Sequence, residues 1–270
     1  MQDPMSIYKL LDQSNCRECG EATCLAFAAA VFRGQRDLSE CTHLSQDVLQ
    51  AYGGQIPARK TVEEDMDQAM QAVQQKVRTI DLAAAARRTG GHFANGTLTL
   101  KVMGKNFHVH ADGSLSADIH VNPWISIPVL KHVLEGTGRQ PTGQWIPFRE
   151  LSQGHSWQGL FEQRCEKPLK KIADSYTGLF QDMLEVFSGR QAESHHGSDI
   201  SIVLHPLPKV PLLICYWKAE EGLESSLHLF FDETVEDNID INAVFAIGSG
   251  LVRMFEQIAL KHEGRGKTYF

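Results

Sequence analysis

Hydrophobic and polar positions follow a helical period in the first third of the chain. Residues 61–91 carry apolar side chains every three or four positions, at Met66, Met70 and Val73 among others. This spacing predicts a long amphipathic helix that is broken at most once. Thr61, with an acidic residue three positions later, is a suitable N-cap for it.

Beyond residue 92 the period shortens to two. Leu98, Leu100 and Val102 alternate with polar residues, and the following Gly104 predicts a tight turn into a second strand. The pair Asp112-Gly113 predicts another hairpin. Further strands are expected at 200–204, 211–217 and 227–231, and helices at 123–134, 158–187 and 241–260, with Pro168 as a break or kink in the second of these helices.

These elements divide the chain into three parts. A small module covers residues 5–50, and Gly53, Gly54 and Pro57 mark its end. A helical connector covers residues 58–91, and a larger domain covers residues 92–270. The expected fold class is α+β, in which the larger domain has a mostly antiparallel sheet flanked by helices.

Charge and hydropathy exclude some functions. The net charge is −7, which argues against a general nucleic-acid-binding protein because phosphate contacts need a basic face. The longest apolar runs, residues 24–32 and 210–217, are far shorter than the roughly 20 residues of a membrane-spanning helix. The N-terminus lacks the pattern of a signal peptide. We therefore expect a cytoplasmic protein with no membrane insertion.

The first module concentrates the cysteines. Cys16, Cys19, Cys24 and Cys41 follow the spacing Cys-x2-Cys-x4-Cys-x16-Cys. Four thiolates suit either an iron–sulfur cluster or zinc. Zinc sites usually have two Cys-x2-Cys pairs, whereas only one is present here, so the spacing favours a [4Fe–4S] cluster over a structural zinc site.

The position of the fourth cysteine constrains the helix that starts near the third. Thr23 is a suitable N-cap for a helix beginning at Cys24, whose positive end would face an anionic cluster. If that helix ran to Leu38 it would carry the chain about 20 Å away. The few residues left before Cys41 extend only about 13 Å, so the helix is expected to end near Gly34.

The module resembles the four-cysteine iron–sulfur domain in the large subunit of the corrinoid iron–sulfur protein and in the B subunit of the Rnf electron-transport complex. This resemblance implies that the four cysteines bind a [4Fe–4S] cluster and that the module transfers electrons at low potential. A threonine stands where a proline often follows the last cysteine. The matching residues are Asn15-Cys16-Arg17-Glu18-Cys19-Gly20, Thr23-Cys24, Phe27-Ala28 and Cys41.

The larger domain resembles an uncharacterised domain of anaerobic prokaryotes that often follows this cysteine module and is described as an iron–sulfur protein. The resemblance implies an anaerobic setting and carries no known activity. The matching segments are Asn95-Gly96-Thr97, residues 145–151, Leu207-Pro208 with Pro211-Leu212, and Phe231-Asp232-Glu233-Thr234.

No standard catalytic motif is present in the larger domain. There is no P-loop, and Gly248-x-Gly250 lacks the rest of a dinucleotide fingerprint. His108 and His110 share one face of a predicted strand, which favours a solvated face over a metal site. The isolated Cys165 and Cys215 are expected to be buried apolar residues.

One segment offers a candidate cofactor site. Asp118-Ile119-His120 partly resembles the Asp-x-His-x-x-Gly motif of proteins that bind cobalamin through histidine, although proline replaces the glycine. In that motif the acid orients the imidazole that binds cobalt. Trp145 and Phe148, in a segment predicted to be a loop, are candidates to line a pocket for a planar cofactor.

The sequence thus favours a [4Fe–4S] protein that transfers electrons to a redox partner protein, or to a cofactor in the larger domain, in anaerobic metabolism. The first alternative is a corrinoid (cobalamin)-binding protein whose cluster reduces the bound cobalt, linked to methyl transfer or one-carbon metabolism. The second alternative is a zinc-stabilised interaction module. Whether the chain is an enzyme is left open.

Overall fold

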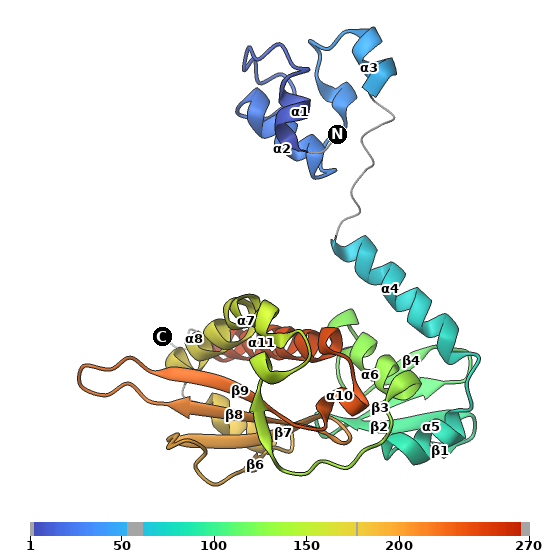
Figure 1. Ribbon diagram of the computed structural model, residues 1–270, viewed down its shortest axis with the longest axis vertical. Helices are drawn as coiled ribbons and strands as arrows, with labels where there is room; N and C mark the ends of the chain where they lie inside the picture. The colour runs from blue at the N-terminus through green and yellow to red at the C-terminus, as the bar shows by residue number, and fades with distance from the viewer. Residues whose placement is uncertain (1–2, 53–61, 177, 266–270) are drawn as a thin grey trace. The chain divides into compact units, whose positions relative to one another are not determined.

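The chain forms two compact units, Met1–Gln68 and Ala69–Phe270. The structure is a computed structural model that describes residues 3–52, 62–176 and 178–265. Thr61, Gly53, Gly54 and Pro57, which were expected to cap the connector helix and to end the first module, lie outside the described residues. Figure 1 shows the elements of each unit.

The first unit consists of short helices around a small apolar core. The helices are α1 (Pro4–Tyr8), α2 (Cys24–Phe32), the 3-10 turn η1 (Leu38–Glu40) and α3 (Gln46–Tyr52). Helix α4 (Val62–Val77) begins in this unit and ends in the second. The buried core residues are Ile7, Leu11, Cys24, Phe27, Ala28, Val31, Leu38 and Cys41.

The second unit is built on two antiparallel sheets, which confirms the α+β prediction. The first sheet has the order β1-β2-β3-β4 and the second the order β5-β9-β8-β7-β6. Backbone N–H of Met103, in the β2–β3 turn, donates to the carbonyl of His205 on β7 and so connects the two sheets. The strands are β1 (His92–Ala94), β2 (Thr97–Val102), β3 (Lys105–His110), β4 (Leu115–Ala117), β5 (Trp145–Pro147), β6 (Arg190–Gln191), β7 (Ile200–Leu207), β8 (Val210–Trp217) and β9 (Ser226–Asp232).

Helices cover one face of the second sheet and enclose the main core (Figure 1). Alternate residues of the central strands, such as Leu212, Ile214 and Phe231, point into this core, as the two-residue strand period requires. Helix α11 packs against α6 and α8 over the sheet. The remaining helices are α5 (Leu82–Thr89), α6 (Pro123–Glu135), η2 (Phe148–Glu150), α7 (Gly154–Phe161), the π-helix η3 (Glu162–Glu166), α8 (Lys167–Ser175), α9 (Leu179–Glu185), α10 (Val235–Asn238) and α11 (Ile241–Arg265).

The hairpins follow the predicted pattern. Leu98, Leu100 and Val102 are buried on one face of β2, and the turn at Met103-Gly104 has positive φ at both residues. A tight turn of this kind matches the twist of the strands that it joins. Gly113 also has positive φ between β3 and β4, so both predicted hairpins are confirmed.

Two local predictions were wrong. Pro168 does not break its helix, because it is the second residue of α8; the π-helix η3 precedes it, and the helical segment expected over 158–187 is interrupted at Tyr176, whose backbone is extended. Proline is tolerated in the first turn of a helical segment. Residues 145–151 are not a loop: β5 pairs with β9, and η2 follows directly.

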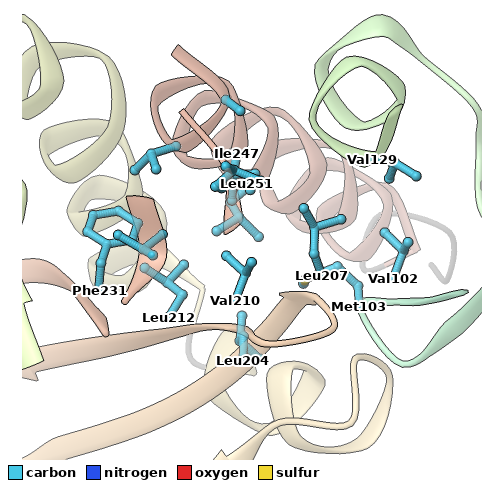
Figure 2. Packing of buried hydrophobic residues seen from close by; sticks show 14 of the residues in the cluster. Val102, Met103, Val129, Leu204, Leu207, Val210, Leu212, Phe231, Ile247 and Leu251 are labelled. Carbon is cyan, nitrogen blue, oxygen red and sulfur yellow. The ribbon is translucent and has the colours of Figure 1, made fainter. Parts of the chain in front are cut away.

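Helix α11 is long and apolar enough over Ile241–Leu260 to cross a membrane, judged by length and composition alone. The core helix of a globular domain meets the same criterion, and Val244, Leu251 and Phe255 of α11 are buried in the main core. The expectation of no membrane segment was based on the length of uninterrupted apolar runs, and this helix contains no long uninterrupted run. Its packing in the core, where Ile247 and Leu251 face residues of the second sheet (Figure 2), explains its apolar composition.

Candidate metal centre

The four clustered cysteines lie in and around one loop of the first unit. Cys16 and Cys19 lie in the loop between α1 and α2, Cys24 is the first residue of α2, and Cys41 follows η1. Cys24 and Cys41 are buried in the apolar core, whereas Cys16 is exposed and Cys19 half-buried. All four are free thiols. They differ from Cys165 and Cys215, which are fully buried in the second unit as expected.

The backbone of this loop alternates in handedness. Gln13, Asn15 and Arg17 have positive φ (61°, 55° and 66°), and so does Gly20 (81°). Positive φ is uncommon for residues other than glycine. Alternating conformations of this kind turn successive N–H groups toward one side, and such concavities bind anions, including iron–sulfur clusters.

Asn15 connects the start of the loop to the third cysteine. Its backbone N–H donates to the Sγ of Cys24 (3.3 Å), and its Oδ1 accepts from the backbone N–H of Cys24 (2.8 Å). This reciprocal pair fixes the Cys24 thiol and satisfies one of the free N–H groups at the start of α2.

Helix α2 has the predicted limits. Thr23 is the N-cap, and its side chain accepts from the N–H of Ala26 (3.0 Å). The helix ends at Phe32, and Gly34 reverses the chain with φ 73°. The 3-10 turn η1 then delivers Cys41. The prediction that the helix ends near Gly34 is confirmed.

Thr42 and His43, which follow the last cysteine, contact the loop that carries Cys16 and Cys19. The Thr42 hydroxyl donates to Glu18 Oε2 (2.6 Å), and His43 lies 3.4 Å from Glu18 Oε2 and 3.3 Å from Asp12 Oδ2. The hydrogen bond from Thr42, followed by the charge of His43, lowers the pKa of Glu18. Thr42, which departs from the proline of the resembling module, thus connects the two cysteine-bearing segments.

The donor set fits an iron–sulfur cluster. Burial raises the pKa of the Cys41 thiol, although a hydrogen bond with the backbone of His43 opposes this effect. Four free thiols, with the Asn15 N–H already donating to the Sγ of Cys24, suit a large anionic group. Among the described residues, Cys16, Glu18 and His43 form the one group of three or more possible ligands whose atoms lie within 4.8 Å of one another, and the four sulfur atoms do not all lie within this distance.

Asp118 and His120 do not form the pair in which the carboxylate would orient the imidazole. The Asp118 carboxylate accepts from the backbone N–H of Asn106 (3.2 Å). In the part of the chain that the structure describes, no hydrogen bond or ion pair joins Asp118 to His120. His120 is exposed and lines a cavity of about 750 Å³ between the start of α6 and helix α11.

The two candidate aromatic residues lie in different environments. Phe148 is buried in the main core and stacks on Phe161 with ring centroids 4.0 Å apart. Trp145 packs on the opposite face of the second sheet with Phe230 and Cys215. The structure therefore does not gather Trp145, Phe148 and His120 into one site.

His108 and His110 both lie on strand β3 and contact hydroxyl groups of neighbouring strands. His108 contacts the hydroxyl of Thr99, and His110 contacts those of Thr97 and Ser116, so both lie on the polar face of the first sheet. These contacts use neighbouring hydroxyl groups and leave no grouped ligand set on this face among the described residues.

The sequence analysis missed a pairing at the cavity beside His120. The Arg253 guanidinium lies over the ring of Trp124, 4.6 Å from its centroid. The two residues are distant in sequence, so no local pattern links them. The sequence signal at this place was Gly250. A glycine within an apolar helix lowers helix stability, so it indicates close packing or open space beside the helix.

Comparison with known proteins separates the two units. The chain matches the family described as "Putative Fe-S cluster" over residues 11–43, and the family described as "Domain of unknown function (DUF3786)" over residues 81–254. No solved structure matches the chain.

Curated relatives match only a short part of the chain. The acetyl-CoA decarbonylase/synthase complex subunit gamma of Methanosarcina acetivorans is 43% identical over 47 residues, which are 17% of this chain and 10% of the relative. The corrinoid/iron-sulfur protein large subunit of Moorella thermoacetica is also 43% identical over 47 residues, with the same coverage. The chain thus spans about a tenth of the length of these relatives.

Proposed function

Because this chain belongs to the family of the domain of unknown function DUF3786, and its first unit is an iron–sulfur module, we propose that it is a cytoplasmic electron-transfer protein of anaerobic metabolism. In this proposal Cys16, Cys19, Cys24 and Cys41 hold a [4Fe–4S] cluster. The second unit would dock a redox partner protein or hold the redox target. The match of residues 11–43 to the family described as "Putative Fe-S cluster" carries the proposal, because all four cysteines lie within these residues.

The loop residues have defined parts in this function. A bound [4Fe–4S] cluster would supply one-electron chemistry. Asn15 fixes the Cys24 thiol, and its N–H donates to the Sγ of Cys24, which would lower the cost of negative charge there. Exposed Cys16 places one ligand at the surface, where a partner protein could approach.

Substitution of single cysteines tests the ligand set. In protein purified without oxygen, Cys16→Ser, Cys19→Ser, Cys24→Ser and Cys41→Ser should each lower iron content and the brown visible absorption. Cys165→Ala is the matched control, because its thiol is buried in the other unit, and it should retain full iron content. Retention of iron in all four module variants would contradict the proposal.

A corrinoid-binding function is the second candidate. One observation favours it: His120, whose ring makes no hydrogen bond among the described residues, lines the cavity of about 750 Å³. The cluster would then reduce the bound cobalt in methyl transfer or one-carbon metabolism. Titration with hydroxocobalamin should give a visible spectral shift that His120→Ala removes. An unchanged spectrum would reject this candidate and leave the electron-transfer proposal intact.

A zinc-stabilised interaction module is the third candidate. The proximity of Cys16, Glu18 and His43 favours it, because thiolate, carboxylate and imidazole all bind zinc. A colourless protein that contains zinc and loses it on His43→Ala substitution would support zinc and reject both redox candidates. A brown protein whose iron survives His43→Ala would reject zinc.

A further inference from the structure

Glu18 stands between the first two cysteines of the loop, with its carboxylate beside a sulfur atom. The Sγ of Cys16, a carboxylate oxygen of Glu18 and a ring nitrogen of His43 lie within 4.8 Å of one another. Cys16 is one of the four proposed ligands, and it is exposed. A full negative charge this close to a ligand sulfur changes the energy of adding an electron to the group that the sulfur binds.

The Thr42 hydroxyl fixes the Glu18 carboxylate in this place. It donates to Glu18 Oε2 at 2.6 Å, from a position 24 residues away in the sequence. The side chain of Glu18 is 55% exposed, so without this hydrogen bond the carboxylate would be free to turn toward water. Ordering a glutamate side chain costs conformational entropy, which this hydrogen bond offsets. Thr42 thus keeps near Cys16 a charge that would otherwise move away.

His43 joins this carboxylate to a second one without cancelling both charges. Its Nε2 lies 3.4 Å from Glu18 Oε2, and its Nδ1 lies 3.3 Å from Asp12 Oδ2. One imidazole carries at most one positive charge, so the three side chains together are negative at neutral pH whether or not His43 is protonated. Arg17, on the same loop, makes no ion pair with either carboxylate within residues 3–52.

We propose that Glu18 lowers the reduction potential of the cluster, and that Thr42 is the positioning residue that holds Glu18 beside Cys16. This inference rests on the proposed [4Fe–4S] function of the first unit. When the bound cluster accepts one electron, from a partner protein or from dithionite in the test below, its negative charge increases by one unit. A carboxylate near a ligand sulfur disfavours that increase, so the reduced protein is a stronger electron donor.

Potentiometric titration with dithionite, followed by electron paramagnetic resonance of the full-length protein, tests the proposal. Glu18→Gln keeps the size of the side chain and an oxygen for the Thr42 hydroxyl, but it removes the charge. At a fixed solution potential the ratio of reduced to oxidised cluster should rise severalfold, up to about tenfold, which corresponds to about 59 mV for one electron. Iron and sulfide per chain should stay at the native level, because Glu18 is not a ligand in this proposal.

Two substitutions of Thr42 separate positioning from a general structural role. Thr42→Val removes the hydroxyl at nearly the same volume, so the potential should rise as in Glu18→Gln while the iron content stays unchanged. Thr42→Ser keeps the hydroxyl and should keep the native potential. If Thr42→Val loses iron, Glu18→Gln and Thr42→Ser decide the outcome.

Asp12→Asn is the matched control for charge. Asp12 contacts the same imidazole as Glu18, but it does not belong to the group of ligand atoms within 4.8 Å that includes Cys16. Its removal should therefore raise the potential less than Glu18→Gln does. Equal shifts in the two variants would mean that the total charge of the first unit sets the potential, and would overturn the proposal.

The failure of this inference can be distinguished from failure of the proposed function. An unchanged potential in Glu18→Gln with the cluster intact, or loss of iron from that variant, would overturn the role of Glu18 and leave the native cluster in place. A native protein that takes up no cluster under anaerobic reconstitution with iron and sulfide would overturn both.

Discussion

At the scale of single residues, the cysteine loop depends on Asn15. This residue has the left-handed conformation and makes two hydrogen bonds to Cys24. Asn15→Ala should lower the iron retained per chain and shorten the lifetime of the visible absorption in air, because the side-chain acceptor is lost and alanine disfavours this conformation. Asn15→Asp keeps the acceptor and should retain more iron. Equal iron retention in the native protein and both variants would argue against this role of Asn15.

A histidine on the second sheet predicts a pH dependence of stability. His228 is half-exposed, with Nδ1 3.5 Å from the buried Glu166 carboxylate, and the hydrogen bond with Glu166 raises the pKa of His228. A raised pKa in the folded state stabilises the protein below the unfolded pKa of about 6.5, and this stabilisation is lost as pH rises through the folded pKa.

His228→Gln should therefore lower the unfolding free energy at about pH 6 by a few tenths to about 1 kcal/mol, and by less at about pH 9. Urea denaturation at the two pH values measures the difference. Burial lowers the pKa of His132, so its protonation destabilises the fold as pH falls, but this contribution is common to both proteins and cancels. A larger effect at high pH would contradict the assignment.

Among the helices, α11 contains two glycines whose substitution by alanine should have opposite effects on stability. A Cβ at Gly248 would lie 2.9 Å from the Sγ of Cys165 and 3.0 Å from Phe161, both fully buried, whereas a Cβ at Gly250 meets only ordinary contacts. Gly248→Ala should destabilise by about 1–3 kcal/mol through overpacking. Gly250→Ala should be neutral or stabilise by up to about 1 kcal/mol through helix propensity. Thermal denaturation of both variants compares them, and equal stability would contradict the packing of η3 against α11.

Local patterns sufficed for elements whose signals lie within a few residues. The alternation of Leu98, Leu100 and Val102 gave β2, and the turn glycine gave the hairpin. The sequence pattern did not predict strand β5, because this strand has three residues and one of them is a proline. The π-helix has no sequence signature, so the irregularity was assigned to Pro168. The division into two sheets depends on pairing between distant residues, such as Met103 and His205.

In the candidate site, too, local sequence identified some residues, and others depend on contacts between distant parts of the chain. The four cysteines could be identified because their spacing is local. The Asn15–Cys24 pair could not, because it depends on left-handed residues that no periodicity reveals. Arg253 and Trp124 meet only when α11 packs against α6.

At the scale of the whole molecule, the two units differ in what stabilises them. The first unit has a core of a few buried residues, two of which are the cysteines Cys24 and Cys41. So small a core rarely supports a fold without a metal or cross-links. The second unit has an extensive core, which contains Cys165 but none of the four cysteines of the first unit.

Removal of the metal should therefore unfold one unit alone. Anaerobic treatment with an oxidant and a chelator should abolish the calorimetric transition of the first unit and leave that of the second unchanged. Cys41→Ser should give the same result without chelator. Two unchanged transitions in the metal-free protein would show that the first unit folds without its metal.

The central claim is that the first unit holds a redox-active [4Fe–4S] cluster. Its most direct test is electron paramagnetic resonance of anaerobically purified protein before and after dithionite reduction, with iron, sulfide and zinc quantified in the same sample. With a [4Fe–4S] cluster bound, iron and acid-labile sulfide should be present in equal amounts, and a signal should appear on one-electron reduction and disappear on reoxidation. A colourless protein that contains zinc, without sulfide or a reducible signal, would contradict this claim.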